Sequence, residues 1–416
     1  SYVMARLLFE KAVAQGDPDA MCDLAWLYRD GQGVVQSFER AVELWTMAAE
    51  QGNTCAMFNL ASLYDEGEGV DQSDGKAIQY YTMAAEQGYV DAMFNLAVLY
   101  DQGEGVDQSD GKAIQYYTMA AEQGEINAMF NLALMYKNGQ GVVQSFKKAA
   151  ELYTMAAEQG HAKAMFSLAK LYKEGEGVDQ SDGNAIQYYA MAAELGHVDA
   201  MFNLAFMYMN GQGVIQSFKK AAELYTMAAE QGHVNAMFNV GILYDESHDE
   251  GKGVDQSDGK AIQYYTMAAE LGQVDAMINL AVMYKNGQGV PQSNKTAREW
   301  LTKAREEGGK GAIEQLRLLD AQEGKPAAIE KAIEQGDLCA MNDLGTLYQH
   351  GKGVVQSSEK AAELYTMAAE QGYVDAMFNL ALMYQDGQGV PQSNKTAREW
   401  FTKARDAGDK GAIEEL

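Results

Sequence analysis

Residues 67–88 decide the fold: they read GEGVDQSDGKAIQYYTMAAEQG and return without a change as residues 103–124. The motif that opens this stretch, G-x-G-V, occurs ten times in the 416 residues, and most copies lie 36 residues apart. A fixed period of this length is typical of a solenoid, in which each repeat buries its apolar face only against its neighbours. The first glycines of the ten motifs are Gly31, Gly67, Gly103, Gly139, Gly175, Gly211, Gly251, Gly287, Gly351 and Gly387.

Each period predicts two helices. The first, helix A, is represented by residues 91–101 (DAMFNLAVLYD), in which Ala92, Leu96, Leu99 and Tyr100 form one apolar stripe. The glycines of the G-x-G-V loop end this helix. The second, helix B, begins at a serine that stands in all ten copies as a cap, and it stops at the next glycine.

The combined pattern A-x-x-x-L-A-x-x-Y, G-x-G-V and S-x-x-K-A-x-x-Y-Y-x-x-A-A-E-Q-G resembles the Sel1-like repeat, a relative of the tetratricopeptide repeat. In most copies Ala replaces the glycine that this family usually has after Leu, although Gly241 and Gly345 keep it. The resemblance implies an all-α, right-handed superhelical α-solenoid of about eleven helix-turn-helix repeats. Because members of that family serve mainly as adaptors that hold proteins together, it also implies binding and not catalysis.

Two irregularities interrupt the period. Four residues are inserted after Tyr244, giving DESHDEG, and Gly287 and Gly351 lie 64 residues apart. The segment AREWLTKAREEGGKGAIEQL near that gap closely matches the C-terminal AREWFTKARDAGDKGAIEEL. We therefore predict one repeat array over residues 1–322 and a second, shorter array over residues 323–416. Whether the second array stacks continuously on the first stays open.

Charge and composition argue against several kinds of partner. The formal net charge is −27, whereas binding to nucleic acid or to an anionic membrane needs a basic face. No apolar run approaches the ~18 residues of a membrane span, and no secretory pattern opens at Ser1. Cys22, Cys55 and Cys339 form no even framework, which favours unpaired thiols in a reducing compartment. A cytoplasmic location is therefore expected, unless a leader was removed before Ser1.

The sequence carries no pattern typical of an enzyme. It contains no G-x-S-x-G and no phosphate-binding G-x-x-x-x-G-K-[ST], so we expect neither catalysis nor a cofactor. His161, His197 and His233 stand one repeat apart, roughly 10 Å in a solenoid, which is too far for one metal ion. The acidic insert at residues 245–250 is a candidate for a cation, but a solvated loop is favoured there. The DQSDG loops lack the spacing of a calcium site.

One face of helix A is predicted to line a concave groove that binds a partner, because A helices line the inside of tetratricopeptide-like superhelices. Asp91, Asn95, Val98 and Gln102 lie opposite the apolar stripe on a helical wheel. We call these four positions of every A helix the inner row, and the residues at one position in successive repeats a column. The second column is polar in every copy, and the third changes most between copies. In these two columns the predicted partner-binding residues are Asp23, Trp26, Asn59, Asn95, Val98, Asn131, Leu134, Lys170, Asn203, Phe206, Asn239, Ile242, Asn279, Asp343 and Asn379.

These columns suggest how a partner would be held. Because an Asn amide both donates and accepts, a ladder of Asn suits the backbone of an extended peptide; alternatively, each Asn bonds a neighbouring helix end or water. Trp26 and Phe206 are the predicted anchors, although neutral drift would give the same variation. We predict a scaffold for an extended, basic or polar polypeptide segment, because acids far outnumber bases in the first and fourth columns. The acidic members are Asp19, Asp30, Glu66, Asp91, Glu174, Asp199, Glu246, Asp275, Asp375 and Asp386.

Helix B offers a second surface on its outer side. A row of methionines would suit self-association there, or each Met packs between successive B helices. The two terminator repeats carry Lys303 and Lys403 instead. The alternative function is therefore a structural protein that polymerises through this face or through its repeat ends. The methionines of this row are Met47, Met83, Met119, Met155, Met191, Met227, Met267 and Met367.

Overall fold

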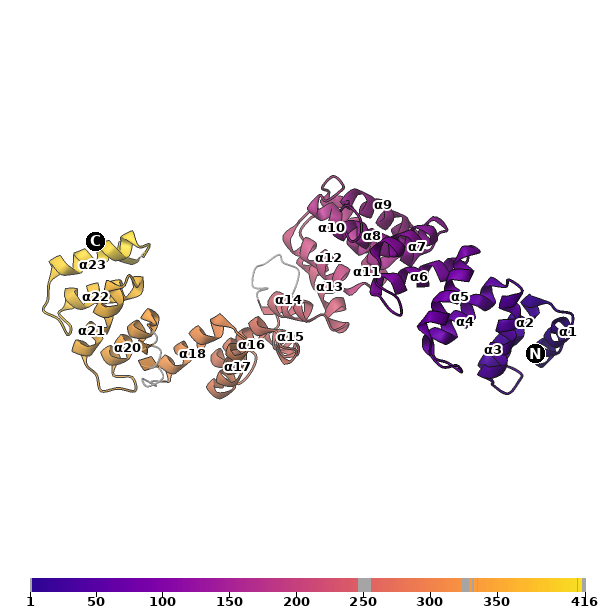
Figure 1. Ribbon diagram of the computed structural model, residues 1–416. Coiled ribbons are helices and arrows are strands. Elements are labelled where there is room, and N and C mark those ends of the chain that lie inside the picture. Colours follow the sequence, from indigo (N-terminus) through magenta and orange to yellow (C-terminus); the bar gives the residue numbers. More distant parts are fainter. Residues whose placement is uncertain are drawn as a thin grey trace. The chain divides into compact units, whose positions relative to one another are not determined.

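The structure is a computed structural model that describes residues 2–245, 256–323, 329–330, 333–334, 336–409 and 411–413. These ranges contain 22 α-helices, one short 3-10 helix (η1, Gly411–Ile413) and no strand, which confirms the all-α prediction. The chain divides into two compact units, residues 1–227 (unit 1) and 228–416 (unit 2), and α13 crosses their boundary. Figure 1 shows the helices of each unit stacking in chain order.

The A helices occur once in each repeat. All are 12 or 13 residues long, close to the mean helix of globular proteins. They are α2 (Pro18–Asp30), α4 (Thr54–Glu66), α6 (Val90–Gln102), α8 (Ile126–Asn138), α10 (Ala162–Glu174) and α12 (Val198–Asn210) in unit 1, and α14 (Val234–Asp245), α16 (Val274–Asn286), α18 (Lys310–Gln322), α20 (Leu338–His350) and α22 (Val374–Asp386) in unit 2.

The B helices alternate with them. Within each unit a B helix packs against the A helix before it and against the A helix of the next repeat, which is the nearest-neighbour pattern of a solenoid. The B helices are α1 (Tyr2–Val13), α3 (Phe38–Glu50), α5 (Asp74–Glu86), α7 (Asp110–Glu122), α9 (Phe146–Glu158), α11 (Asp182–Glu194), α13 (Phe218–Glu230), α15 (Asp258–Glu270), α17 (Asn294–Glu306), α21 (Ser358–Glu370) and α23 (Asn394–Asp406).

The loop between the two helices is built from side-chain and backbone caps. Nine of the ten predicted serine caps accept a hydrogen bond from the amide three residues ahead. Ser73 stands at the same position but makes no side-chain bond of this kind. A glutamine before each serine adds a contact that the sequence analysis did not assign: Gln144 Nε2, for example, donates to the Lys137 carbonyl at 2.8 Å. This bond satisfies a carbonyl that the end of helix A leaves without a partner.

The second glycine of the loop is required by a close approach. At Gly177 the backbone has φ = +71°, and an added Cβ would lie 2.3 Å from the carbonyl carbon of Phe146. Phe146 opens the B helix of the preceding repeat, so the loop packs directly on that helix. Gly160, at the end of α9, also has positive φ, but nothing lies within 4 Å of an added Cβ. Gly177 therefore holds two repeats together, and Gly160 does not.

The core of each repeat combines small and large side chains. Ala97 of α6 is 0% exposed, and Tyr117 of α7 is 1% exposed. Met93 is buried as well, because α6 packs on both α5 and α7. Tyr100, which we predicted in the apolar stripe, is instead half-buried. Its ring stacks on Tyr116 with 6.0 Å between centroids, at the edge of the repeat.

The histidine column caps A helices. His161 Nδ1 accepts the amide of Ala164 at 3.1 Å, and His197 Nδ1 accepts the amide of Ala200 at 3.3 Å. Each ring also lies against a Phe of the preceding repeat, such as Phe130 at 4.8 Å from His161. The column therefore has a structural role, as expected for residues too far apart to share a metal ion. Burial lowers the pKa of both His161 and His197.

These two caps predict a pH-dependent stability. A protonated Nδ1 cannot accept the amide, and the folded-state pKa lies below the unfolded value of about 6.5. The cap contribution is therefore present above about pH 6.5 and is lost as the pH falls through the folded pKa. We expect a loss of about 0.5 kcal/mol per histidine, the low end for caps, because both rings are partly solvated. Urea unfolding on both sides of this window measures the change.

The chain supplies the control for this experiment. Asn53 occupies the same cap position and accepts from the amide of Ala56 at 2.8 Å. The variant His161→Asn/His197→Asn keeps an acceptor that does not titrate in this window. It is expected to lose less stability on acidification than the wild-type chain. Equal losses in the two proteins would show that the histidine caps are not responsible.

Unit 2 contains two arginine clusters around α18. Arg298 of α17 bridges to Asp320 at 2.7 Å and to Glu323 at 2.8 Å. Arg317 of α18, 7% exposed, contacts Asp343 of α20. Helix α18 thus contacts both the repeat before it and the repeat after it. The predicted array boundary at residues 322 and 323 lies inside unit 2, and it stays a prediction.

Candidate partner-binding surface

The side chains of the second column are more buried than their predicted position opposite the apolar stripe suggests. Asn59 is buried, at 5% exposed, whereas Asp23 is exposed. The other predicted members are half-buried, and they are Asn95, Asn131, Asn203, Asn239, Asn279, Asp343 and Asn379.

Several of these amides have partners inside the protein. Asn131 Nδ2 donates to the hydroxyl of Tyr117 in the preceding repeat at 3.1 Å, and Asn379 Nδ2 donates to Asn342 Oδ1 at 2.9 Å. Asn203 instead donates to the carbonyl of Asp199, one turn earlier, at 2.7 Å. The predicted ladder therefore has a structural part, which joins consecutive repeats. Each of these bonds uses the amide nitrogen, while an Asn side chain also carries a carbonyl acceptor.

The third column lies at intermediate depth in the ten repeats that carry G-x-G-V. Half-buried side chains of this kind can contact both the core and a ligand. The predicted members, all half-buried, are Trp26, Val98, Leu134, Lys170, Phe206 and Ile242.

A cationic side chain lies close to the ring of each predicted aromatic anchor. The Arg29 guanidinium carbon lies 3.8 Å from the centre of a Trp26 ring, and Lys173 Nζ lies 5.4 Å from that of Phe206. Trp26 also packs edge-on against the buried Trp45, with ring centroids 5.7 Å apart. Both anchors are thus held in place from within the protein, and a partner would meet a ring that is already oriented.

About half of the positions in the first and fourth columns carry acids, and those that the structure describes are exposed. The pKa of Asp23, an exposed second-column residue beside these acids, is raised, first by partial desolvation and then by the neighbouring charges of Asp19 and Asp17. Carboxylates that repel one another in this way favour a cationic ligand. Glu246 lies outside the described residues. The exposed acids of these columns are Asp19, Asp30, Glu66, Asp91, Glu174, Asp199, Asp275, Asp375 and Asp386.

A pocket lies at the N-terminal end of the inner row. Its volume is about 190 Å³. It brings together two predicted residues, Trp26 and Asn59, with others that the sequence analysis missed. The Phe58 ring lies 5.1 Å from Tyr89 between centroids, so aromatic carbon forms part of the wall. The residues that line the pocket are Trp26, Arg29, Cys55, Phe58, Asn59, Ser62, Leu63, Glu66, Glu68 and Tyr89.

The missed Phe column could have been found from the sequence. Phe58 has counterparts in most repeats, such as Phe94 and Phe130. Its position next to the Asn column places it near the edge of the inner row on a helical wheel. The inner row covers only the face directly opposite the apolar stripe, whereas neighbouring repeats bury part of that face and leave the Phe side chains beside it partly exposed.

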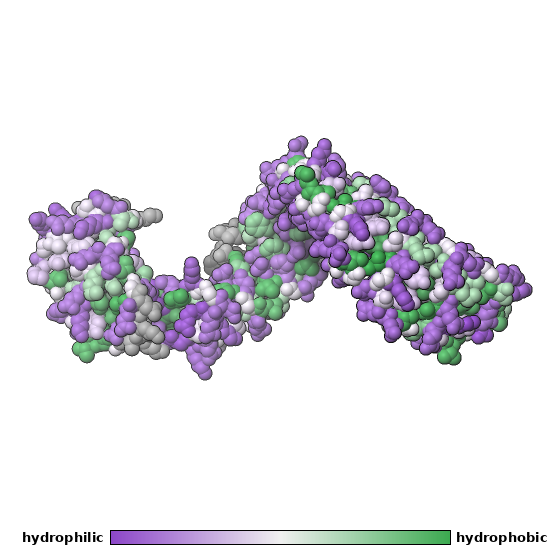
Figure 2. Space-filling view, viewed as in Figure 1, coloured by the Kyte–Doolittle hydropathy of each residue, from purple (hydrophilic) through white to green (hydrophobic). Residues whose placement is uncertain are grey.

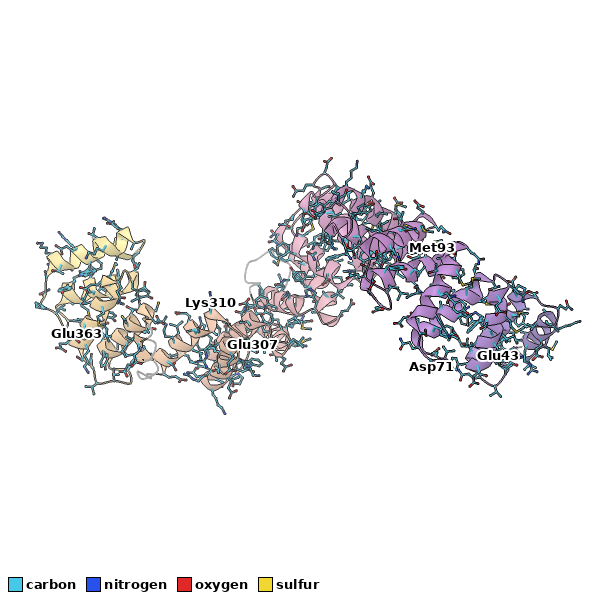
Figure 3. All side chains as sticks on the ribbon, viewed as in Figure 1. Glu43, Asp71, Met93, Glu307, Lys310 and Glu363 are labelled. Carbon is cyan, nitrogen blue, oxygen red and sulfur yellow. The ribbon has the colours of Figure 1, made fainter. Side chains whose placement is uncertain are left out.

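The outer side of the B helices is less uniform than predicted. Met47, Met155, Met227 and Met367 are 44–48% exposed, whereas the described methionines at the same position in the other repeats are half-buried. Figure 2 shows a mainly hydrophilic face with separate groups of hydrophobic residues. Figure 3 labels two exposed acids of the B helices, Glu43 on α3 and Glu363 on α21. Self-association through a continuous methionine row, the alternative function, gains no support from this pattern.

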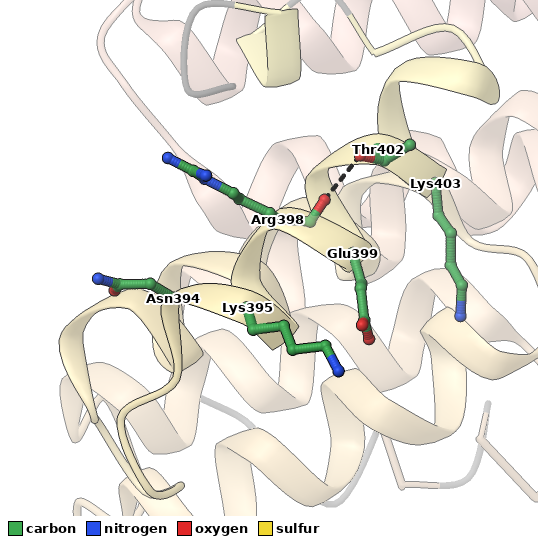
Figure 4. A pocket seen from close by; sticks show the side chains of 6 residues that line it. All are labelled: Asn394, Lys395, Arg398, Glu399, Thr402 and Lys403. Atoms are coloured by element: carbon green, nitrogen blue, oxygen red, sulfur yellow. Dashed lines mark hydrogen bonds between the residues drawn. The ribbon is translucent and has the colours of Figure 1, made fainter.

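The last B helix presents a basic patch where earlier repeats have methionine. An open depression on α23 is lined by Asn394, Lys395, Arg398, Glu399, Thr402 and Lys403 (Figure 4). The Thr402 hydroxyl donates to the Arg398 carbonyl at 2.7 Å. Lys403 Nζ lies 3.8 Å from the centre of a Trp400 ring and so covers an apolar surface.

The described residues contain neither a cluster of metal ligands nor a membrane-spanning helix. Among them, no three His, Cys, Asp or Glu side chains lie close enough together to hold a metal ion. The acidic insert predicted as a cation candidate lies mostly outside the described residues. None of the helices in the described ranges combines the length and the apolar character that crossing a membrane requires.

Solved structures that resemble the chain support the fold. A protective antigen present in uropathogenic Escherichia coli strains, displaying an SLR fold, matches with 30% identity and a TM-score of 0.79, over 99% of this chain and 91% of that one. A Sel1 repeat protein from Oxalobacter formigenes matches with 30% identity and a TM-score of 0.60, over 76% of this chain and 90% of that one. No protein with a curated functional description matches the sequence.

The Sel1 repeat family model matches eleven segments of the chain. The first covers half a repeat, and residues 310–339 lie outside the matches. The matched segments are residues 1–17, 18–53, 56–89, 90–125, 126–161, 162–197, 198–233, 234–273, 274–309, 340–373 and 374–409. With nearly all of its repeats matched, the chain belongs to the Sel1 repeat family.

Proposed function

We propose that this protein is a non-catalytic scaffold that binds an extended, basic or polar polypeptide segment along the inner row of its A helices. Sel1 repeat proteins generally mediate protein–protein interaction, which supports a protein as the partner. The observation that carries the finer proposal is the exposure of the acidic columns on both sides of half-buried Asn and variable apolar residues.

The charge of this row favours a cationic segment. Acids such as Glu66, Asp91 and Glu174 are all exposed. Lys163 and Lys170 are the basic residues that interrupt them. Complementary charges raise the association rate and orient an incoming chain before close contacts form. A basic segment would therefore be attracted at low ionic strength and released as salt is added.

Apolar anchors and amides would provide the close contacts. Trp26 and Phe206 are oriented aromatic rings at intermediate depth, a feature typical of residues that dominate binding energy. The Asn amides would contact the peptide backbone, which explains how a segment of variable sequence is held. Asn131 already donates one N–H to Tyr117, so its share in binding would come from its second N–H and its carbonyl oxygen.

Charge reversal tests the proposal. The variant Glu66→Lys/Asp91→Lys/Glu174→Lys reverses three exposed acids of the inner row. Its matched control, Glu86→Lys/Glu122→Lys/Glu194→Lys, reverses three exposed acids on B helices. Both proteins and the wild type are used to capture proteins from a cell extract, and each captured protein is then titrated directly. We expect the inner-row variant to bind at least about tenfold more weakly while the control is unchanged.

Two results would contradict this function. If both triple variants lose binding equally, net charge and not the inner row attracts the partner. If neither loses binding, the partner contacts another surface. Circular dichroism of each variant excludes unfolding as the cause, because all six positions are exposed and their substitution should change stability by less than about 0.5 kcal/mol.

A further inference from the structure

Two cysteines meet at the N-terminal end of the inner row. Cys22 of α2 and Cys55 of α4 come from consecutive A helices, and their sulfur atoms are 3.3 Å apart. Both are free thiols in the structure. A disulfide bond is about 2.05 Å long, so the sulfurs need to approach by roughly 1.2 Å more. Side-chain rotation of half-exposed Cys55 can supply a movement of this size.

The two thiols have different environments. Cys22 is 3% exposed, whereas Cys55 lines the pocket described above and is reached from the inner row. Cys55 Sγ accepts hydrogen bonds from Cys22 and from Asn59 Nδ2, each at 3.3 Å. The bond from Cys22 is the main reason why the pKa of Cys55 is lowered, and the bond from Asn59 lowers it further. The pKa of Cys22 is raised by the same contact and by burial.

These environments suit two different roles: Cys55 would attack a reagent first, and Cys22 would then displace that reagent from Cys55. A thiolate is the reactive form of cysteine, and it must be accessible to a reagent. Cys55 meets both conditions. Cys22 is shielded from solvent but lies in contact with the atom that a first reaction would modify.

We propose that Cys22 and Cys55 form a modification site that small-molecule disulfides oxidise to an intramolecular disulfide. The Cys55 thiolate attacks one sulfur of the reagent, breaks its S–S bond and releases one thiolate, which leaves a mixed disulfide on Cys55. The Cys22 thiol then attacks the Cys55 sulfur and breaks the mixed disulfide, and its proton passes to the second half of the reagent, which leaves as a thiol. Two protein thiols are oxidised by two electrons, and one reagent disulfide is reduced to two thiols.

The charge around the pocket selects the reagent. Glu66 and Glu68 line it, and Asp23 lies one residue from Cys22. Arg29 is the cation in the lining, and its Nε is already paired with Asp30 Oδ1 at 2.8 Å. A cationic disulfide such as cystamine is therefore expected to react faster than an anionic one such as oxidised glutathione.

Mass spectrometry of the full chain tests the site. All proteins carry Cys339→Ser, so that the pair contains their only cysteines. After treatment with cystamine, the parent protein is expected to lose the mass of two hydrogen atoms and to carry no adduct, with a link between residues 22 and 55 in the peptide map. The variant Cys22→Ala is expected to stop at a cystamine adduct on Cys55. The variant Cys55→Ala is expected to stay unreacted, because Cys22 alone is buried.

The proposal has clear contrary outcomes. It is wrong if the parent protein keeps a cystamine adduct on Cys55, because Cys22 would then fail to resolve it. It is equally wrong if both thiols can still be alkylated after the treatment. A faster reaction with oxidised glutathione than with cystamine would overturn the assigned reagent class. Far-ultraviolet circular dichroism on each variant establishes that the thiols are compared in the folded chain.

Discussion

The substitution Tyr117→Ala is expected to destabilise the middle of unit 1 by about 3–5 kcal/mol. Tyr117 is 1% exposed, and its ring lies 6.0 Å from that of Phe94 between centroids. Its hydroxyl accepts a hydrogen bond from Asn131 of the next repeat. Truncation would therefore leave a cavity in one repeat and remove a contact with the next. Urea unfolding followed by circular dichroism measures the loss.

Two variants separate the ring from its hydroxyl. Tyr117→Phe keeps the ring, and we expect it to lose about 1 kcal/mol. Leu301 and Phe401 stand in the same column and are buried at 1%, so the site accepts an apolar side chain without a hydroxyl. Tyr2→Ala, at a position that is 58% exposed, should change stability by less than about 0.5 kcal/mol. If Tyr117→Ala unfolds at the same urea concentration as Tyr2→Ala, the tyrosine column does not hold the repeats together.

The parts of the fold that lie within one repeat could be predicted from the sequence. Helix A was expected at residues 91–101 and is observed at Val90–Gln102. The serine caps and the glycine exits were also found, because each works with backbone a few residues away and recurs at every period. The Gln144 contact was missed although its column is constant. Periodicity shows that a residue is needed, and it does not show which carbonyl the side chain reaches.

Contacts between repeats could not be predicted from the same pattern. The helical wheel placed Asn131 opposite the core, but it gave no depth, and the next helix layer brings Asn131 within 3.1 Å of Tyr117. Cys22 and Cys55 stand in different columns, so the period gave no reason to pair them. Their proximity depends on the rotation between consecutive repeats. That rotation is a property of the packing, which one repeat taken alone does not contain.

The second large effect is expected for Arg317→Ala in unit 2. The Arg317 side chain is 7% exposed and contacts Asp343 and Glu314, with Asp337 Oδ2 4.0 Å from its Nε. Without the guanidinium, Asp343 would remain largely buried beside two other carboxylates. Burial already raises the pKa of Asp343, and the arginine opposes that effect. Removing one partner of such a pair costs about 2–5 kcal/mol.

The matched control is Arg305→Ala, because Arg305 is exposed at the end of α17 and should contribute less than about 0.5 kcal/mol. Hydrogen exchange of the α18 and α20 amides locates the effect. The double variant Arg317→Ala/Asp343→Asn should recover part of the stability, since it removes the uncompensated charge. If Arg317→Ala leaves exchange in both helices unchanged, the arrays predicted at residues 1–322 and 323–416 are energetically independent at this contact. Faster exchange on both sides would mean that Asp343, predicted as a partner-binding residue, joins the two arrays instead.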